Sequence, residues 1–203
     1  RLPFPASGVT EMAHGQARKV ARESEPVVRT FLFSDIVKST DIRNHFVRKE
    51  GARRGNEGYR KEIRGPHNKR IERCIRACKG EVVSTAGDSY FVAFRDARQA
   101  IECAVAFQRS LISDPIPIQV AGAHLPRTVQ VRIGMHWGPA TQVLSARQPN
   151  YDDETINIAR RIQEYAAGEQ ILISQETWRQ AGEIPGIRKQ EYHGYPLKGV
   201  RGA

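Results

Sequence analysis

A tight β-hairpin is the clearest structural signal in this sequence of 203 residues. Two short runs rich in β-branched and aromatic residues, Glu81–Thr85 and Ser89–Phe94, flank the turn Ala86-Gly87-Asp88. A glycine-containing turn between two apolar segments predicts a pair of antiparallel strands. The fold must therefore accommodate an antiparallel sheet, and Asp88 is expected in the turn of a hairpin.

Other strand and helix patterns surround this hairpin. Alternating apolar residues predict further strands at Val27–Ile36, Thr128–His136 and Gln170–Ser174. Helical spacing predicts helices at Ile63–Lys79, Asp96–Leu111, Glu154–Ala166 and Gln175–Ala181, and a helix capped by Ser39 or Thr40. Residues 43–59 are harder to interpret because three glycines interrupt them, and strands are expected in the tail to Leu197. This order predicts an α+β sandwich, one mainly antiparallel sheet covered by helices.

The chain is expected to form one domain over residues 27–203, preceded by a flexible lead-in over residues 1–26. No apolar run approaches the ~18 residues of a membrane span, and the lead-in lacks the apolar region of a signal peptide. The three cysteines are an odd number and favour free thiols in a reducing compartment. A cytoplasmic location is therefore expected.

Positive charge is concentrated in one segment. The formal net charge is +10, and the segment Arg43–Lys79 holds 13 Lys or Arg against four Glu. A surplus of this kind favours polyanionic partners, such as nucleic acid, anionic lipid or nucleotide phosphates, although solubility alone could also explain it. The charge is thus local, and the rest of the chain is close to neutral.

Two aspartates are expected at strand ends. Asp35 ends the apolar run Thr30–Ile36, and Asp88 lies in the hairpin turn. If the two strands are neighbours, the carboxylates converge on a site that suits Mg²⁺, which favours one or two carboxylates together with substrate phosphates. Two metal ions held in this way support an in-line phosphoryl displacement. An aspartate in a turn is common, so neither residue alone would indicate a metal site.

Two further groups of residues suit a phosphate. The backbone N–H groups of Val37, Ser39 and Thr40 follow Asp35 where a helix begins. Asn157 and Arg161 are four residues apart in a predicted helix and therefore share one face. There an amide could orient a ribose, and a guanidinium could stabilise charge on a phosphate. A solvated polar helix face is the alternative explanation.

Taken together, these motifs resemble the class III nucleotidyl cyclase catalytic domain over about residues 28–199. The segments that carry the resemblance are Phe33-Ser34-Asp35-Ile36-Val37-Lys38-Ser39-Thr40, Gly87-Asp88, Arg132-Ile133-Gly134-Met135-His136-Trp137-Gly138, Asn157 with Arg161, and Leu197-Lys198-Gly199. The resemblance implies a ferredoxin-like sandwich. It also implies conversion of a nucleoside triphosphate to its 3′,5′-cyclic monophosphate and pyrophosphate, with two Mn²⁺ or Mg²⁺ ions.

The resemblance also implies roles for individual residues. Asp35, Asp88 and the carbonyl of Ile36 match the metal ligands of the family. Asn157 matches the ribose-orienting residue, Arg161 the residue that stabilises the pentavalent phosphate, and Lys198 a lysine that binds the terminal phosphates. The family works as a head-to-tail dimer with sites at the interface, so a homodimer with two sites is expected. A separate effector would then read the cyclic product.

The base pocket departs from the family pattern. Ser84 stands where adenylate cyclases carry lysine, and Asn150 where they carry aspartate or threonine. Both side chains are neutral and can donate and accept hydrogen bonds, which suits the donor and acceptors of uracil. This pattern is similar to the pyrimidine cyclases of bacterial anti-phage signalling, the Pycsar type. UTP is therefore the first expected substrate, with cUMP as product in antiviral defence, and CTP or ATP the alternatives.

Two other functions are compatible with parts of the sequence. The strand Ser89–Phe94 has aromatic residues like those of RNA-recognition domains, and the basic surplus agrees with a nucleic-acid-binding module. However, the glycines that flank those aromatics in such domains are absent here. A degenerate cyclase that binds nucleotide without turnover is the third interpretation, and the presence of all four matched active-site residues opposes it.

Overall fold

A computed structural model of the chain describes residues 24–119, 124–143 and 150–191. Five strands form a sheet in the order β2-β3-β1-β4-β5, and a sixth strand, β6, pairs in parallel with β4. The strands are β1 (Ser24–Ile36), β2 (Glu81–Ala86), β3 (Ser89–Phe94), β4 (Val131–Val143), β5 (Asn150–Asp152) and β6 (Ile171–Ile173). All other pairings are antiparallel. The predicted α+β sandwich with a mainly antiparallel sheet is confirmed.

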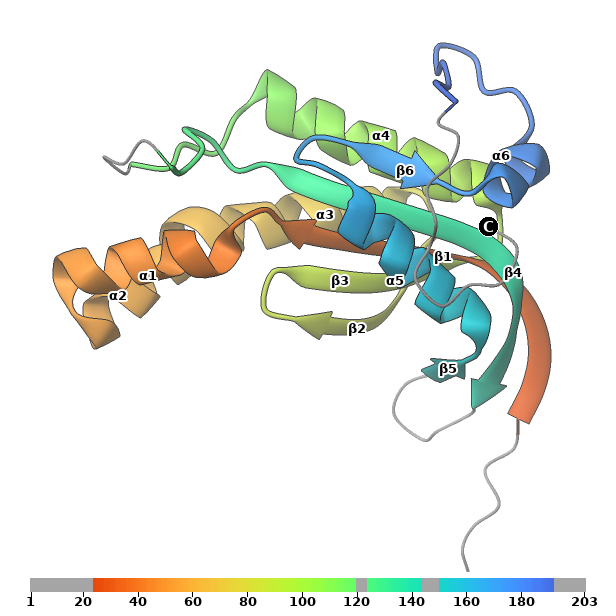
Figure 1. Ribbon diagram of the computed structural model, residues 1–203, viewed down its shortest axis with the longest axis horizontal. Helices are drawn as coiled ribbons and strands as arrows, with labels where there is room; N and C mark the ends of the chain where they lie inside the picture. The colour runs from red at the N-terminus through yellow and green to blue at the C-terminus, as the bar shows by residue number, and fades with distance from the viewer. Residues whose placement is uncertain (1–23, 120–123, 144–149, 192–203) are drawn as a thin grey trace, which may run out of the picture.

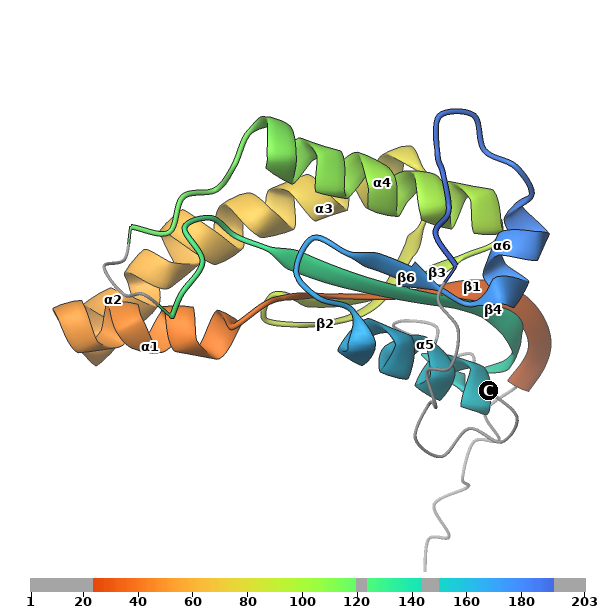
Figure 2. The same ribbon diagram turned by 45° about the horizontal axis from the view of Figure 1, so that its top comes forward.

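Helices cover both faces of this sheet (Figure 2). Those on one side are α3 (Gly65–Ala77) and α4 (Ala97–Ser113), with α6 (Gln175–Ala181) beside α4, whereas α5 (Glu154–Tyr165) covers the other side. Each face has its own buried cluster. The larger packs under α3 and α4, and the smaller joins α5 to Phe31, Phe33 and Phe91 of the sheet. No helix in the described part of the chain is long and apolar enough to cross a membrane.

The helices α1 (Ser39–Glu50) and α2 (Ala52–Tyr59) extend from one end of the sheet (Figure 1). A π-helical turn, η1 (Arg60–Arg64), joins α2 directly to α3, so helical backbone continues from residue 52 to residue 77. Residues 43–59, which had no clear prediction because of their three glycines, are largely helical in the structure. Gly51, with φ of 80°, separates α1 from α2, and Gly55 lies inside α2.

Several predicted boundaries differ from the structure. Strand β1 begins at Ser24 and therefore includes the end of the predicted lead-in, of which residues 1–23 lie outside the described residues. Strand β4 continues to Val143, seven residues past the predicted end at His136, and β5 was not predicted. No strand follows α6 between residues 182 and 191, and the rest of the predicted tail lies outside the described residues.

Gly55 allows α1 and α2 to pack closely, which gives a testable difference between two glycines of α2. A Cβ at Gly55 would lie 2.5 Å from the Cα of Val47 and against the carbonyl of Phe46, whereas a Cβ at Gly58 would lie 3.1 Å from the Phe46 ring. We expect Gly55→Ala to lower the free energy of unfolding by about 1–3 kcal/mol in urea denaturation, because backbone cannot move aside. Gly58→Ala is the matched control and should be near neutral, because the ring can shift and alanine favours the helix. Equal losses in both variants would contradict the close approach at Gly55.

Candidate functional site

Asp35 lies near the end of the central strand β1, between β3 and β4. The register of β1 with β4 places Arg132 opposite Asp35, and Nη2 of Arg132 is 3.1 Å from Oδ2 of Asp35. From β3, the Ser89 hydroxyl donates to Oδ1 of Asp35 over 2.8 Å. Both carboxylate oxygens are thus oriented by the neighbouring strands.

Asp88 lies beside Asp35 in the turn between β2 and β3, where Gly87 has φ of 70°. Its Oδ2 accepts a hydrogen bond of 3.3 Å from the backbone N–H of Ile36, and its Oδ1 accepts one of 3.4 Å from the Tyr59 hydroxyl. Asp88 is only 9% exposed. The two aspartates therefore lie next to each other, as predicted. Ile36 contacts Asp88 through its backbone N–H, and the metal-ligand role expected for its carbonyl stays a prediction.

The electrostatics of this pair suit a divalent cation. Burial raises the pKa of Asp88, and the neighbouring Asp35 carboxylate raises it further. Burial also raises the pKa of Tyr59, so its hydroxyl stays protonated and acts as a donor to Asp88. Two adjacent carboxylates of which one is desolvated gain from a positive charge between them. Among the described residues, no group of three or more His, Cys, Asp or Glu side chains could hold a metal ion without other ligands.

The start of α1 differs in part from the predicted phosphate site. Neither Ser39 nor Thr40 caps α1, because the N-cap residue is Lys38 in the left-handed conformation, and it makes no side-chain cap bond. The amide of Val37 is already used, since it donates to the carbonyl of Gln130 over 2.9 Å. Ser39 and Thr40 begin the helix, where backbone N–H groups lack intrahelical partners. Two of the three predicted phosphate-facing amides therefore keep the expected position.

Asn157 and Arg161 lie together on α5, as the helical spacing predicts. They line an open pocket with Arg160, Glu164 and Tyr165. Nη1 of Arg161 is buried and has no hydrogen-bond partner within the described chain. No hydrogen bond or ion pair among the described residues joins Asn157 or Arg161 to Asp35 or Asp88. The predicted site residues thus form two separate groups. We call Asp35 with Asp88 the carboxylate half-site, and Asn157 with Arg161 the α5 half-site.

Ser84 and Asn150 lie on the strands β2 and β5, and both side chains are exposed. Their neighbours Val83 and Tyr151 belong to the same buried cluster, so the curved sheet brings the two strands to one side of the molecule. The Oδ1 of Asn150 accepts the Tyr151 N–H over 2.9 Å. No hydrogen bond joins Ser84 to Asn150 in the described structure. Lys198 lies outside the described residues.

Sequence reasoning missed three residues that hold the aspartates. Arg132 and Ser89 orient Asp35, and Tyr59 donates to Asp88. Arg132 and Ser89 stand within predicted strands, but their partners depend on the register between strands, which local patterns do not give. Tyr59 belongs to the glycine-rich region that had no clear prediction. No local sequence signal could have identified it.

The sequence of the chain matches one protein family and two curated relatives in particular. Residues 20–203 match the family model described as "Adenylate and Guanylate cyclase catalytic domain". The chain is 26% identical over 185 residues, 83% of its length, to an adenylate cyclase of Mycosarcoma maydis, and 28% identical over 164 residues, 72% of its length, to one of Neurospora crassa. It spans only 7% of the length of each of these curated relatives.

Solved structures show the same fold. The adenylyl cyclase CyaB from P. aeruginosa superposes with a TM-score of 0.68 at 18% identity, covering 88% of this chain and 91% of that one. The monomeric guanylyl cyclase domain of the RhoGC fusion protein from Blastocladiella emersonii gives 0.62 at 19% identity, covering 77% of this chain and 86% of that one. At these identities the likeness concerns the fold alone.

Proposed function

The chain belongs to the adenylate and guanylate cyclase catalytic-domain family, and from this premise we propose that it is a nucleotidyl cyclase. It would close a nucleoside triphosphate to the 3′,5′-cyclic monophosphate and release pyrophosphate. The observation that supports this most is the pair Asp35 and Asp88, two carboxylates held side by side with one of them buried. Such a pair fits two Mg²⁺ or Mn²⁺ ions, which when bound would supply positive charge to the reacting phosphate.

The residues of the chain then have distinct tasks. Asp35 and Asp88 hold the cation site, with Arg132 and Tyr59 as positioning residues that fix the two carboxylates. Asn157 orients the ribose so that its 3′-hydroxyl faces the α-phosphorus. Arg161 stabilises the charge that develops on that phosphate, since this side chain lines the open pocket beside Asn157.

A complete site requires two copies of the chain. Among the described residues, no hydrogen bond or ion pair joins the carboxylates to Asn157 or Arg161. A head-to-tail homodimer would bring the carboxylates of one protomer to the α5 helix of its partner, and a two-fold arrangement produces two such sites. The open pocket that Asn157 and Arg161 line supports this arrangement, because a second protomer can reach it. Arg161 also has a donor without a partner in its own chain, so the guanidinium gains by turning towards a phosphate in this pocket.

We propose UTP as the preferred substrate because the two predicted base-contacting residues are neutral. Oδ1 of Asn150 already accepts the Tyr151 N–H, but a carbonyl oxygen has a second lone pair for the N3–H of uracil. Its amide group can donate to a neighbouring uracil carbonyl. ATP is the second candidate, favoured by the adenylate cyclase relatives. The proposal includes a role for cUMP in antiviral signalling through a separate effector.

Incubation with Mn²⁺ and each of the four nucleoside triphosphates tests the substrate. We expect cUMP to form at least about tenfold faster than the other cyclic products, because a mismatched base leaves the polar groups of Ser84 and Asn150 unpaired once the nucleotide covers them. Chromatography with mass spectrometry identifies the product. The double variant Ser84→Lys with Asn150→Asp restores an adenine-type pair and should shift the preference towards ATP. A product from ATP alone in the unaltered chain would contradict the preference for UTP and leave the cyclase proposal intact.

A further inference from the structure

The basic segment Arg43–Lys79 forms a helical arm, and Tyr59 is the one residue of it to which the proposed catalytic reaction gives a task. It comprises most of α1 with α2, η1 and α3, and its outer part extends beyond the sheet (Figure 1). Of its 13 Lys and Arg residues, only Arg70 forms an ion pair within the described chain, with Asp114. The arm therefore carries a dense positive charge that the protein does not neutralise itself.

The cations form a ridge along the continuous helix from residue 52 to residue 77. The residues that this helix buries recur every four positions: Gly55, Tyr59, Ile63, His67, Ile71 and Ile75. Six positions of this helix each lie two residues before a buried residue, which on a helix is the opposite side. Four of them hold the exposed cations Arg53, Lys61, Lys69 and Arg73, and the other two hold Glu57 and Gly65. At 1.5 Å per residue the ridge is about 30 Å long, close to one turn of a nucleic-acid duplex.

The chemistry of the arm favours a phosphate backbone over other polyanions. Nine of its 13 cations are arginines, whose planar guanidinium groups match phosphate oxygens in pairs. A membrane-surface helix needs exposed apolar residues to insert, and none of the large exposed hydrophobic residues in the described structure lies on the arm. Single-stranded nucleic acid needs exposed aromatic rings for stacking, but Phe46 and Tyr59 are buried. A duplex needs neither feature.

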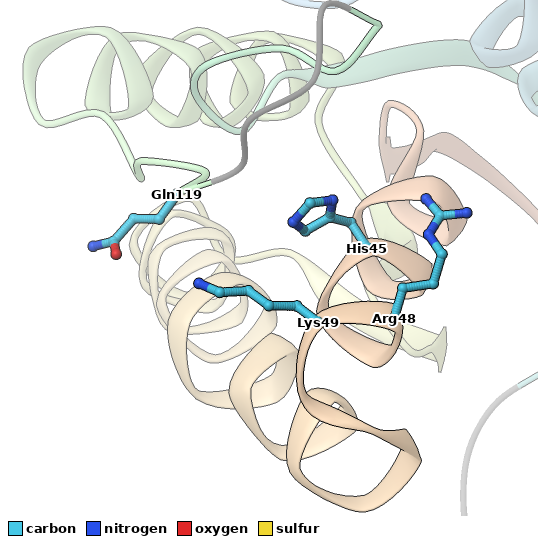
Figure 3. A pocket seen from close by; sticks show the side chains of 4 residues that line it. All are labelled: His45, Arg48, Lys49 and Gln119. Carbon is cyan, nitrogen blue, oxygen red and sulfur yellow. The ribbon is translucent and has the colours of Figure 1, made fainter.

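A pocket beside α1 adds a hollow with a mostly basic lining. It measures about 480 Å³ and is lined by His45, Arg48, Lys49 and Gln119. His45 and Lys49 extend from α1 towards the side on which Gln119 lies (Figure 3). Three of the four lining side chains are basic, so the hollow extends the positive surface of the arm onto α1.

From this ridge and hollow we propose that the arm binds the phosphate backbone of duplex nucleic acid without reading its sequence. The residues of the ridge lie on the outer side of the helix, away from Tyr59 and the aspartates. Binding therefore depends on neither the cyclase reaction nor the dimer of the proposed function. Duplex DNA and duplex RNA present the same backbone chemistry, and the experiment separates them.

Fluorescence anisotropy with labelled duplexes of about 20 base pairs and unrelated sequences tests the proposal. We expect the full chain to bind either duplex DNA or duplex RNA, or both, with an affinity that falls steeply with salt, because each neutralised phosphate contributes about −0.9 to the slope of log K against log salt. The variant with Arg53, Lys61, Lys69 and Arg73 all changed to Gln should bind at least tenfold more weakly. If each of the four cations neutralises one phosphate, its salt slope should be shallower by about 3.6.

A control variant separates the arm from overall charge. Arg95, Arg127, Arg179 and Arg188 are exposed and lie outside the arm, so changing them to Gln removes the same net charge. This control should bind duplexes within about twofold of the unaltered chain, and circular dichroism should show both variants folded. Equal loss of binding in both variants would overturn the proposal. So would the absence of duplex binding, a preference for single strands, or binding only to vesicles of anionic lipid.

Discussion

Replacing Asp88 by Asn is expected to abolish nucleotide cyclisation and yet to stabilise the metal-free protein. Asp88 is 9% exposed and lies beside Asp35, so its negative charge is both desolvated and repelled. The amide keeps the size of the side chain, and its oxygen can still accept the Ile36 N–H. Because the charge is removed and the hydrogen bond kept, the free energy of unfolding should rise by about 1 kcal/mol in urea denaturation.

Activity should change in the opposite direction. In the proposed mechanism the variant lacks one of the two carboxylates that hold the cations, so the rate of cyclic nucleotide formation should fall by about a thousandfold or more. Mn²⁺ provides a readout without substrate: it should raise the melting temperature of the unaltered chain and leave that of Asp88→Asn unchanged. Mn²⁺ stabilisation that survives in the variant would show that Asp88 is not a ligand.

Asp35→Asn is the matched comparison for this prediction. Asp35 is more exposed and forms an ion pair of 3.1 Å with Arg132, so neutralising it leaves the arginine without its partner. We expect the same loss of activity but lower stability in the metal-free protein. Thus the two aspartates should agree in their effect on catalysis and differ in sign in their effect on unfolding. A loss of stability in both would mean that the buried charge of Asp88 is already compensated.

The position of the two aspartates could be predicted because it depends on local patterns. A glycine turn between two apolar runs places Asp88 in a hairpin, and the end of an apolar run places Asp35 at the end of a strand. Helical spacing likewise places Asn157 and Arg161 on one face. These predictions need only the periodicity of a few neighbouring residues.

Other parts depend on contacts between distant segments. Gly55 discouraged a helix prediction, yet a residue without a side chain is what allows α2 to approach Phe46 and Val47. Strand β4 continues through Pro139, which lies between the segments of β4 that pair with β6 and β5. A proline is tolerated in a strand where no ladder bond is needed. A few neighbouring residues in the sequence predict neither the close approach at Gly55 nor the continuation of β4 through Pro139.

The hydrogen-bond partners of the two aspartates also depend on contacts between distant segments, so local patterns do not predict them. Arg132 faces Asp35 only because β1 and β4 pair in one particular register. Tyr59 reaches Asp88 because α2 and η1 continue into α3 and pass the hairpin. Local patterns therefore predict the two carboxylates on which the proposed chemistry depends. They do not predict the tertiary arrangement that raises the pKa of Asp88.

Mixing two inactive variants should restore cyclase activity if each site is shared between protomers. Asp35→Ala removes a residue of the carboxylate half-site, and Arg161→Ala removes one from the α5 half-site. After the subunits exchange, half of the dimers contain one chain of each kind. In a head-to-tail dimer each mixed pair has one intact site and one doubly defective site, so activity should return to about a quarter of the unaltered level.

The control for this experiment is a mixture in which both defects lie in the carboxylate half-site. Asp35→Ala mixed with Asp88→Asn leaves every site without one carboxylate, so no activity should return. Recovery in that mixture would mean that the two aspartates serve different sites. Failure of the first mixture, when exchange of subunits is shown by mass spectrometry, would mean that Asp35 and Arg161 act within one chain. The unpartnered nitrogen of Arg161 would then need another ligand, because within the described chain it has none.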